Sequence, residues 1–221
     1  MAIAFCPFFL LFLFVKLFRI IKMTTKRGGH KAADAMDWDE ALRLIDCMFK
    51  DGLYRNALLF ASGCYLGLRV SDLLLLHWAD LLSEEFILKE QKTRKQRTLR
   101  VNEALRIFTE SCWKELGRPP EDAFIFVPKN GVNPISRQAV DRMLKKARIK
   151  YQVNTAKVFS SHTMRKTFGR RVWLQECDKG RGEQALVLLC DVYGHSSVAI
   201  TKRYLGIRQD EILSIYDALN G

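Results

Sequence analysis

The chain carries SSHTMRKTFGRRVW at residues 160–173 and VYGHSSVAITKRYLG at residues 192–206. The first stretch places His162 and Arg165 three residues apart, so both side chains project from one face of an expected helix. Near a helix N-terminus they would add donors to a position that already suits a phosphate. Taken alone, a solvated basic face is the simpler explanation, because more cations follow in the same stretch.

The second stretch feeds a turn into a short helix that carries a tyrosine. His195 follows a glycine just outside the expected helix start, and Tyr204 comes nine residues later. Each residue alone is explained by a turn hydrogen bond or by packing. In this order, however, an arginine, two histidines and a phenol are the groups needed to attack a phosphodiester through a tyrosine.

Two further cations lie upstream. Arg69 stands in GCYLGLRVSDLL immediately ahead of an expected helix, where it is either a surface residue or an inward anion ligand with five fixed donors. Lys92 lies at the basic tip of an expected hairpin. The simpler explanation of that tip is contact with a phosphate backbone.

The composition favours a folded protein with a polyanionic partner. Hydrophobic residues make up 48% of the chain, which is enough to bury a core and argues against global disorder. The formal net charge is +12, from 36 Lys and Arg against 24 Asp and Glu. A surplus of this size indicates either nucleic acid or an acidic membrane surface as partner.

Residues 1–22 form a hydrophobic preamble that differs from the rest of the chain. Its apolar run is short for a membrane span, which needs about 20 residues, and its positive charges follow the run where a signal peptide carries them before it. A membrane anchor and a poor signal sequence are therefore the alternatives. We favour a mis-assigned start with the natural one at Met23, and we take residues 23–36 as a basic tail or linker.

Cysteine usage and motif content argue against metals and cofactors. The six cysteines are scattered, without a C-x-x-C pair or a histidine at ligand spacing, which is typical of reduced core residues in a cytoplasmic protein and not of a zinc site. The sequence also lacks a carboxylate cluster for two-metal catalysis and a Gly-rich nucleotide loop. We expect no cofactor.

Periodicity and capping residues predict a mainly α-helical fold with one small antiparallel β-sheet, an α+β arrangement. The first helix is expected to turn Ala41, Leu42, Ile45, Met48 and Phe49 inward. The expected helices are 37–50, 54–65, 72–78, 102–117, 136–148, 161–176, 183–192, 197–204 and 209–219. The expected strands are 86–89 and 98–101, on either side of a basic tip at 90–97, and a brief extended piece is expected at 124–127.

The combined motifs resemble the tyrosine recombinases of the phage integrase family. The order is an arginine, a hairpin lysine, His-x-x-Arg, Gly-His and then a tyrosine nine residues later. The resemblance spans residues 37–221, which we expect to form a catalytic domain of that family. The segments that carry it are GLRVSDLLLLHWADL, the Lys92-Thr93 pair, FVPKNGVNPIS, SHTMRKTF and YGHSSVAITKRY.

The resemblance implies a role for each site residue. Tyr204 would attack a scissile phosphate to give a 3′-phosphotyrosyl link and a free 5′-hydroxyl. Arg69 and Arg165 would bind the non-bridging oxygens and stabilise the charge of the transition state. Lys92 would be the general acid for the leaving 5′-oxygen, with Lys95 as its rival.

The remaining roles concern proton transfer and support. His162 would assist proton transfer from the phenol, and His195 would bond the phosphate. Asp72 would orient Arg69 or its neighbours, although an acid that favours a helix start is an equally good account. Double-stranded DNA is the expected partner, and its contacts are assigned to Arg94, Lys95, Arg97, Lys166, Arg170, Lys202 and Arg203.

The resemblance also raises questions of assembly. Members of the family usually carry a helical domain ahead of the catalytic domain, and residues 1–36 are too few to form one. A minimal form, a fragment, or an accessory protein that supplies the missing clamp would each account for this. The tail GIRQDEILSIYDALNG is expected to dock on a neighbouring protomer in a homo-oligomer on DNA, with docking on its own domain as the alternative.

Four functions remain open from the residues. The leading one is site-specific strand exchange, as in DNA integration and recombination on a mobile genetic element. A catalytically idle DNA-binding relic or regulator is the alternative from a different class. A type IB-like topoisomerase would share the tyrosine chemistry, and a membrane-associated protein would use the basic face on lipid.

Overall fold

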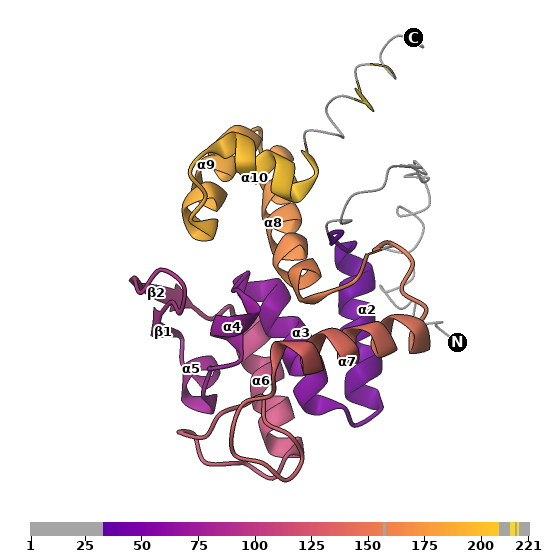
Figure 1. Cartoon of the computed structure of the whole chain (residues 1–221), viewed down its shortest axis with the longest axis vertical. Coiled ribbons are helices and arrows are strands. Elements are labelled where there is room, and N and C mark those ends of the chain that lie inside the picture. Colours follow the sequence, from indigo (N-terminus) through magenta and orange to yellow (C-terminus); the bar gives the residue numbers. More distant parts are fainter. Residues whose placement is uncertain (1–32, 157, 208–212, 215, 217–221) are drawn as a thin grey trace, which may run out of the picture. The chain divides into compact units, whose positions relative to one another are not determined.

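The computed structural model describes residues 33–156, 158–207, 213, 214 and 216. The predicted preamble at 1–22, most of the linker at 23–36 and most of the helix expected at 209–219 lie outside this part of the chain. Figure 1 labels the elements, whose bounds follow. They are α2 (Trp38–Lys50), α3 (Tyr54–Leu66), α4 (Val70–Leu73), α5 (Trp78–Leu82), β1 (Glu85–Lys89), β2 (Gln96–Arg100), α6 (Glu103–Glu115), α7 (Arg137–Lys150), α8 (Ser161–Cys177), α9 (Gly182–Tyr193) and α10 (Val198–Leu205).

The predicted fold class is confirmed: the described part is mainly helical with one two-stranded antiparallel sheet. The main core gathers around α3, which is buried along most of its length because its residues are apolar or small. Gly63 lets α8 approach closely, since a Cβ there would lie 2.7 Å from Met164 Cβ. Gly67 adopts φ +60° and ends α3, so the chain turns directly into the segment that carries Arg69.

Helix α8 joins this core to a second one. In Figure 1 it runs between the group formed by α2, α3 and α7 and the pair α9–α10. The second core is formed by Leu186, Leu189, Tyr193, Leu205 and Ile207. It is tightly packed at Gly169 of α8, where a Cβ would overlap the hydroxyl of Tyr193 and lie 2.7 Å from Leu205 Cδ2.

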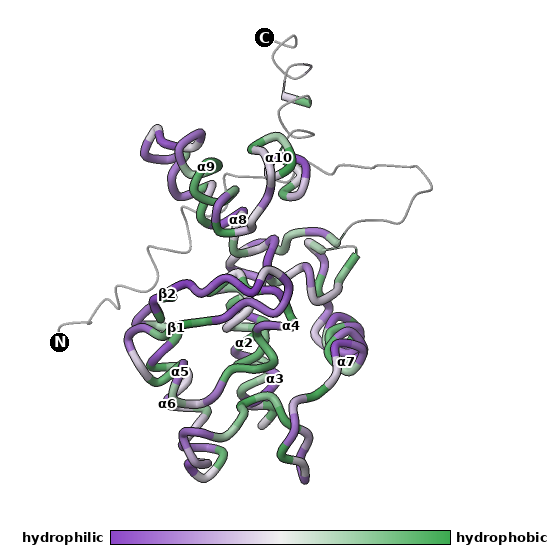
Figure 2. The backbone as a smooth tube through the Cα atoms, turned by 60° about the vertical axis from the view of Figure 1, so that its left-hand side comes forward, coloured by the Kyte–Doolittle hydropathy of each residue, from purple (hydrophilic) through white to green (hydrophobic). Residues whose placement is uncertain are grey.

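The hairpin agrees with the prediction apart from its bounds. Lys89 pairs with Gln96 at the end of the ladder, so the tip is confined to residues 90–95 and Arg97 belongs to β2. Figure 2 colours β1 largely as hydrophobic and β2 as hydrophilic. The expected strand at 124–127 is reduced to a single bridge between Phe124 and His77.

The helix expected at 72–78 is wrong. A single helical turn at α4 is followed by a break at residues 74–77, and α5 then begins at Trp78 with His77 as its N-cap. The break has a packing reason, because consecutive leucines in one helix would point in all directions. As folded, Leu73, Leu74 and Leu76 are buried and only Leu75 is exposed.

The inward face of α2 is partly mispredicted. Ala41, Ile45 and Met48 are buried as expected, but Leu42 is 39% exposed while Leu44, which we did not assign inward, is fully buried. The side chains of Asn102, Ser136, Ser160 and Ser197 each accept a backbone N–H at the start of their helices, whereas Asp37 makes no such side-chain hydrogen bond at the start of α2.

The structure bears on the predictions about cysteines, metal sites and membrane spans only within the described residues. Cys47, Cys64, Cys112, Cys177 and Cys190 are free thiols, and Cys177 is exposed where a core position was expected. Within the described residues, no group of histidines, cysteines and carboxylates could hold a metal ion. No helix there is long and apolar enough to cross a bilayer.

Candidate active site

The two arginines singled out from the sequence meet at one main-chain oxygen. Arg69, the N-cap of α4, donates from Nη2 to the carbonyl of Tyr193 at 3.0 Å. Arg165, from the second turn of α8, donates from Nη2 to the same carbonyl at 3.2 Å. Tyr193 ends α9, where last-turn carbonyls lack intrahelical partners and the helix dipole favours cations. The end of α9 therefore holds both guanidinium groups together.

Each guanidinium is oriented by a second acceptor. Arg69 Nη1 donates to Glu90 Oε2 at 2.9 Å, and Arg165 Nη1 donates to the Gly67 carbonyl at 2.6 Å. A guanidinium has five N–H donors, so these contacts fix its plane without using all of them. The remaining donors can bind the two non-bridging oxygens of a phosphate.

Arg165 is a buried cation that no carboxylate neutralises in the described part of the chain. Its residue is 5% exposed, and within the described residues no carboxylate forms an ion pair with it. Its guanidinium lies 4.4 Å from the ring centroid of Tyr193. Burial lowers its pKa, but an arginine keeps its charge in proteins. A buried charge without an acidic partner is costly, which is the expected condition of a site that receives a phosphate.

Tyr204 presents a buried hydroxyl at this site. It lies in α10, and its ring centroid is 5.3 Å from those of both Tyr193 and His195. The hydroxyl is buried, and among the described residues Arg165 is near enough to interact with it, although outside ordinary hydrogen-bond geometry. Burial raises the pKa of Tyr204, while the charge and side-chain N–H groups of Arg165 and the charge of Arg69 act in the opposite direction. The phenol thus sits beside the cations that would stabilise its ionised form.

Lys166 lies against the ring of the same tyrosine. Its ammonium is 5.0 Å from the Tyr204 ring centroid, and the residue is 7% exposed. Burial lowers the pKa of Lys166, and the carboxylate of Asp34 partly offsets this. Lys166 was predicted to contact DNA, with a solvated basic face as the simpler alternative; the structure buries it instead against Tyr204.

His195, in the turn after Gly194, is held beside Tyr204. Its Nδ1 lies 3.0 Å from Oγ1 of Thr201, which is fully buried in α10. Burial and the charges of Arg165 and Arg69 lower the pKa of His195. The imidazole is therefore neutral at pH 7 and can act as donor or acceptor.

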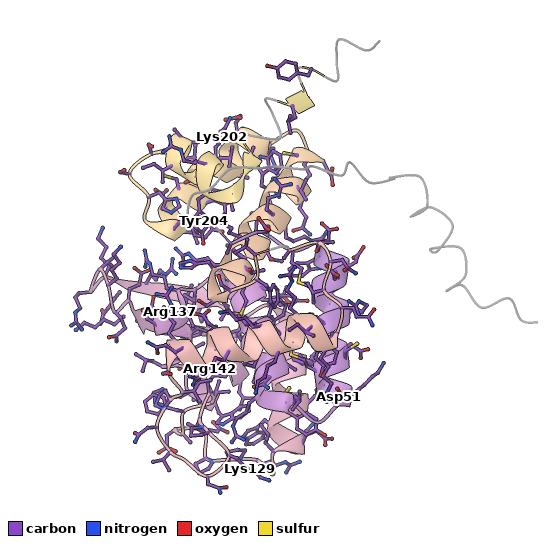
Figure 3. All side chains as sticks on the ribbon, turned by 45° about the vertical axis from the view of Figure 1, so that its right-hand side comes forward. Asp51, Lys129, Arg137, Arg142, Lys202 and Tyr204 are labelled. Carbon is purple, nitrogen blue, oxygen red and sulfur yellow. The ribbon has the colours of Figure 1, made fainter. Side chains whose placement is uncertain are left out.

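His162 lies at the start of α8 on the surface. Its Nε2 is 3.5 Å from Nη2 of Arg137, the first residue of α7, which we did not assign to the site. Partial burial and the charge of Arg137 lower the pKa of His162, so the ring is neutral at pH 7 and can accept a proton. In Figure 3, Tyr204 lies on the side of α10 that faces the end of α7 carrying Arg137.

The hairpin tip presents its lysines to solvent. Lys92, Arg94 and Lys95 are all exposed, and within the described residues no hydrogen bond or ion pair joins their side chains to Arg69 or Arg165. The tip is tied to Arg69 through Glu90, which the sequence reasoning missed. The available signal was its position as the one acid in the basic run KEQKTRKQR.

Asp72 lies in the first turn of α4, as the helix-start account expects, and no hydrogen bond joins its side chain to Arg69 within the described residues. Asp72 is buried, and its Oδ1 accepts the backbone N–H of Gln91 at 2.8 Å. It therefore anchors the hairpin tip next to Lys92, while Glu90 contacts Arg69.

The other residues predicted to contact DNA differ in their surroundings and exposure. Arg97 is drawn inward, donating to the Val192 carbonyl at 3.0 Å and lying 3.4 Å from Glu90. Lys202 pairs with Glu183 at 2.9 Å on the side of α10 away from Tyr204 (Figure 3). Arg170 lies 5.6 Å from the ring centroid of Trp173, and Arg203 is exposed.

The sequence matches a known family of proteins. The family model described as "Phage integrase family" matches residues 34–211. The probable integrase/recombinase YoeC of Bacillus subtilis (strain 168) is 29% identical over 168 residues, which are 76% of this chain and 86% of YoeC. The tyrosine recombinase XerC of Xanthomonas axonopodis pv. citri (strain 306) is 30% identical over 198 residues, covering 87% of this chain and 60% of XerC.

A solved structure supports the fold. The Tn1549 transposon integrase in complex with transposon right end DNA aligns with a TM-score of 0.62 at 16% identity, covering 92% of this chain and 75% of that one. The aligned part of the chain thus spans 86% of YoeC, 60% of XerC and 75% of the solved Tn1549 integrase. The resemblance inferred from the motifs is confirmed.

Proposed function

This chain belongs to the phage integrase family, and on that premise we propose that it is a site-specific DNA recombinase that cuts and rejoins strands through a 3′-phosphotyrosyl intermediate. The relatives carry integrase and recombinase names, and one of them is solved with DNA. Double-stranded DNA is the proposed substrate, and the positive charge of +12 supports it.

The proposed reaction begins at Tyr204. Its oxygen attacks the scissile phosphorus, a new phosphotyrosyl bond forms, and the bond to the 5′-oxygen breaks. Arg69 and Arg165 bind the non-bridging oxygens, whose charge grows in the transition state. Because the phosphotyrosyl bond conserves the phosphodiester energy, a 5′-hydroxyl from another strand can reverse the step without a nucleotide.

Proton transfers complete the step. The phenol proton passes to neutral His162, and Lys92 donates a proton to the leaving 5′-oxygen. His195 holds a phosphate oxygen. Lys95 is the rival general acid, since it is equally exposed at the hairpin tip. On rejoining, the same groups exchange their proton-donating and proton-accepting roles.

DNA contacts are proposed for the exposed cations nearest this site. Arg94 and Lys95 lie at the hairpin tip and Arg203 beside the nucleophile. Such contacts would position the phosphate backbone and make binding fall steeply with added salt. Assembly of a homo-oligomer through the C-terminal tail remains part of the proposal, and that tail lies largely outside the described residues.

One observation carries the proposal. The buried hydroxyl of Tyr204 lies beside Arg165, a buried arginine without an acidic partner in the described part of the chain, and Arg165 shares a carbonyl with Arg69. A candidate nucleophile and a buried cation that lacks an acidic partner thus lie at one place. A phosphodiester satisfies the two at once.

A nicked suicide substrate tests the proposal. The DNA carries the attachment site that flanks the gene, with a nick that lets the short 5′-hydroxyl strand diffuse away after cleavage and so traps the adduct. Wild type should yield a protein–DNA band that survives denaturation, and Tyr204→Phe should yield none. Tyr216→Phe serves as the matched control, because Tyr216 is an exposed tyrosine.

Three results would decide against it. Tight DNA binding without an adduct would identify a relic or regulator. An adduct that persists in Tyr204→Phe would remove the nucleophile assignment. Resealing of the original strand without joining to a second duplex would identify a topoisomerase.

A further inference from the structure

Glu90 is the one acidic side chain at the tip of the hairpin, and it is almost completely buried. It is 7% exposed, whereas its neighbours Gln91, Lys92 and Thr93 are all exposed. A carboxylate removed from water needs charged or hydrogen-bonding partners. The partners of this carboxylate therefore show which parts of the protein the hairpin tip is attached to.

Both carboxylate oxygens are occupied. Oε2 accepts from Arg69 Nη1 at 2.9 Å and from the Thr93 hydroxyl at 2.7 Å. Oε1 lies 3.4 Å from Nε of Arg97. The main chain of Glu90 closes the tip, donating to the Lys95 carbonyl at 3.0 Å and accepting from the Arg94 N–H at 2.9 Å.

The carboxylate of Glu90 thus links the hairpin tip to the arginines at the end of α9. Through Arg69 and Arg97 it is joined to the end of α9, since these arginines donate to the carbonyls of Tyr193 and Val192. Through Thr93 and its own main chain it is part of the turn that displays Lys92. Lys92 is two residues from Glu90, and consecutive Cα atoms are about 3.8 Å apart.

We propose that Glu90 is a positioning residue that locks the hairpin tip to Arg69, so that Lys92 is delivered to the same phosphate that Arg69 binds. This inference rests on the proposed function. Without the bond between Glu90 and Arg69, the tip would be an exposed turn that carries a long, flexible lysine. A side chain that rotates freely must first be ordered before it can donate a proton, which slows the reaction. General acid catalysis contributes about 10²–10⁴-fold, so loss of the lock should forfeit a large part of that factor.

The test separates proton donation from phosphate binding. A second suicide DNA carries sulfur in place of the leaving 5′-oxygen. A thiol, with a pKa of about 8.5, leaves as thiolate without a proton donor, whereas an alkoxide needs one. Lys92→Ala should be slow on the oxygen substrate and close to wild type on the sulfur substrate. Arg69→Ala should be slow on both.

Glu90→Ala should behave like Lys92→Ala. We expect cleavage of the oxygen substrate to fall about 10–100-fold, as a partial loss of the general acid factor, with most of the rate recovered on sulfur. Glu90→Gln, which keeps the shape and one acceptor oxygen, should fall less. Glu85→Gln is the matched control, because Glu85 lies exposed in the same hairpin and pairs across the strands with Arg100.

The outcomes are distinct. If Glu90→Ala and Glu90→Gln are equally slow on both substrates, Glu90 acts through Arg69 or the fold alone and the proposal is overturned. Wild-type rates for both variants on oxygen also overturn it. If wild type forms no adduct on either substrate, the proposed function itself has failed, which is a different result. Thermal unfolding and DNA binding of each variant confirm that a folded protein is being compared.

Discussion

Gly169→Ala probes the packing that holds the two arginines in place. Gly169 lies in α8 where α9 and α10 approach, and its Cβ position is already taken by the hydroxyl of Tyr193. That hydroxyl donates to the Arg165 carbonyl at 2.7 Å, and the carbonyl of Tyr193 accepts from Arg69 and Arg165. An added methyl group therefore pushes on the residue that organises the site.

The expected change in the free energy of unfolding of Gly169→Ala is the sum of opposing effects. Replacing glycine by alanine inside a helix stabilises by about 1 kcal/mol. Overpacking costs about 1–3 kcal/mol, and losing the hydrogen bond from Tyr193 costs about another 1 kcal/mol. We expect a net loss of about 2 kcal/mol. Since a displacement of about 1 Å can cost about 100-fold in rate, adduct formation should fall by at least 10-fold.

A double-mutant cycle isolates the cause. Tyr193→Phe removes the overlapping oxygen but leaves Leu205 Cδ2 at 2.7 Å from the added methyl group. Gly169→Ala should therefore cost about 1 kcal/mol less in the Tyr193→Phe background than in wild type, when urea unfolding midpoints are compared. Additive effects, or a Gly169→Ala variant more stable than wild type, would refute the close approach of α8 and α9.

Three further predictions concern the site, the core and pH. Arg165→Lys loses the fork that binds two acceptors, so adduct formation on the suicide DNA should fall about 10²–10³-fold. Leu44→Ala should lower the unfolding free energy in urea by about 3–5 kcal/mol, whereas Leu42→Ala should change it by less than about 1 kcal/mol. Burial alone would raise the pKa of Glu90, but hydrogen bonds from Thr93 and Arg69 and the charge of Arg97 hold it below its ordinary value. Its ionised form therefore stabilises the fold above about pH 4.3, and the melting-temperature advantage of wild type over Glu90→Gln should disappear as the pH falls through the lowered pKa.

Much of the site could be predicted because its residues belong to local patterns. His162 and Arg165 share one helix face, and His195 and Tyr204 are joined by a turn and a short helix. Spacing in the sequence expresses such relations directly.

The parts that sequence reasoning missed depend on tertiary contacts. Tyr193 acts mainly through its main-chain oxygen, and a carbonyl has no residue-type signal. Glu90 and Lys166 are charged residues whose burial is decided by elements far away in the chain. The helix expected at 72–78 failed similarly, since burial of three leucines against the core outweighed their helix propensity.

Mapping the covalent bond tests the central claim most directly. The adduct from the suicide DNA is digested with nuclease and trypsin, and the modified peptide is sequenced by mass spectrometry. Cleavage after Arg203 and Arg208 yields the peptide YLGIR, whose only tyrosine is Tyr204. The account predicts a nucleotide joined through its 3′-phosphate to this tyrosine. Attachment to any other residue, or through a 5′-phosphate, would contradict it.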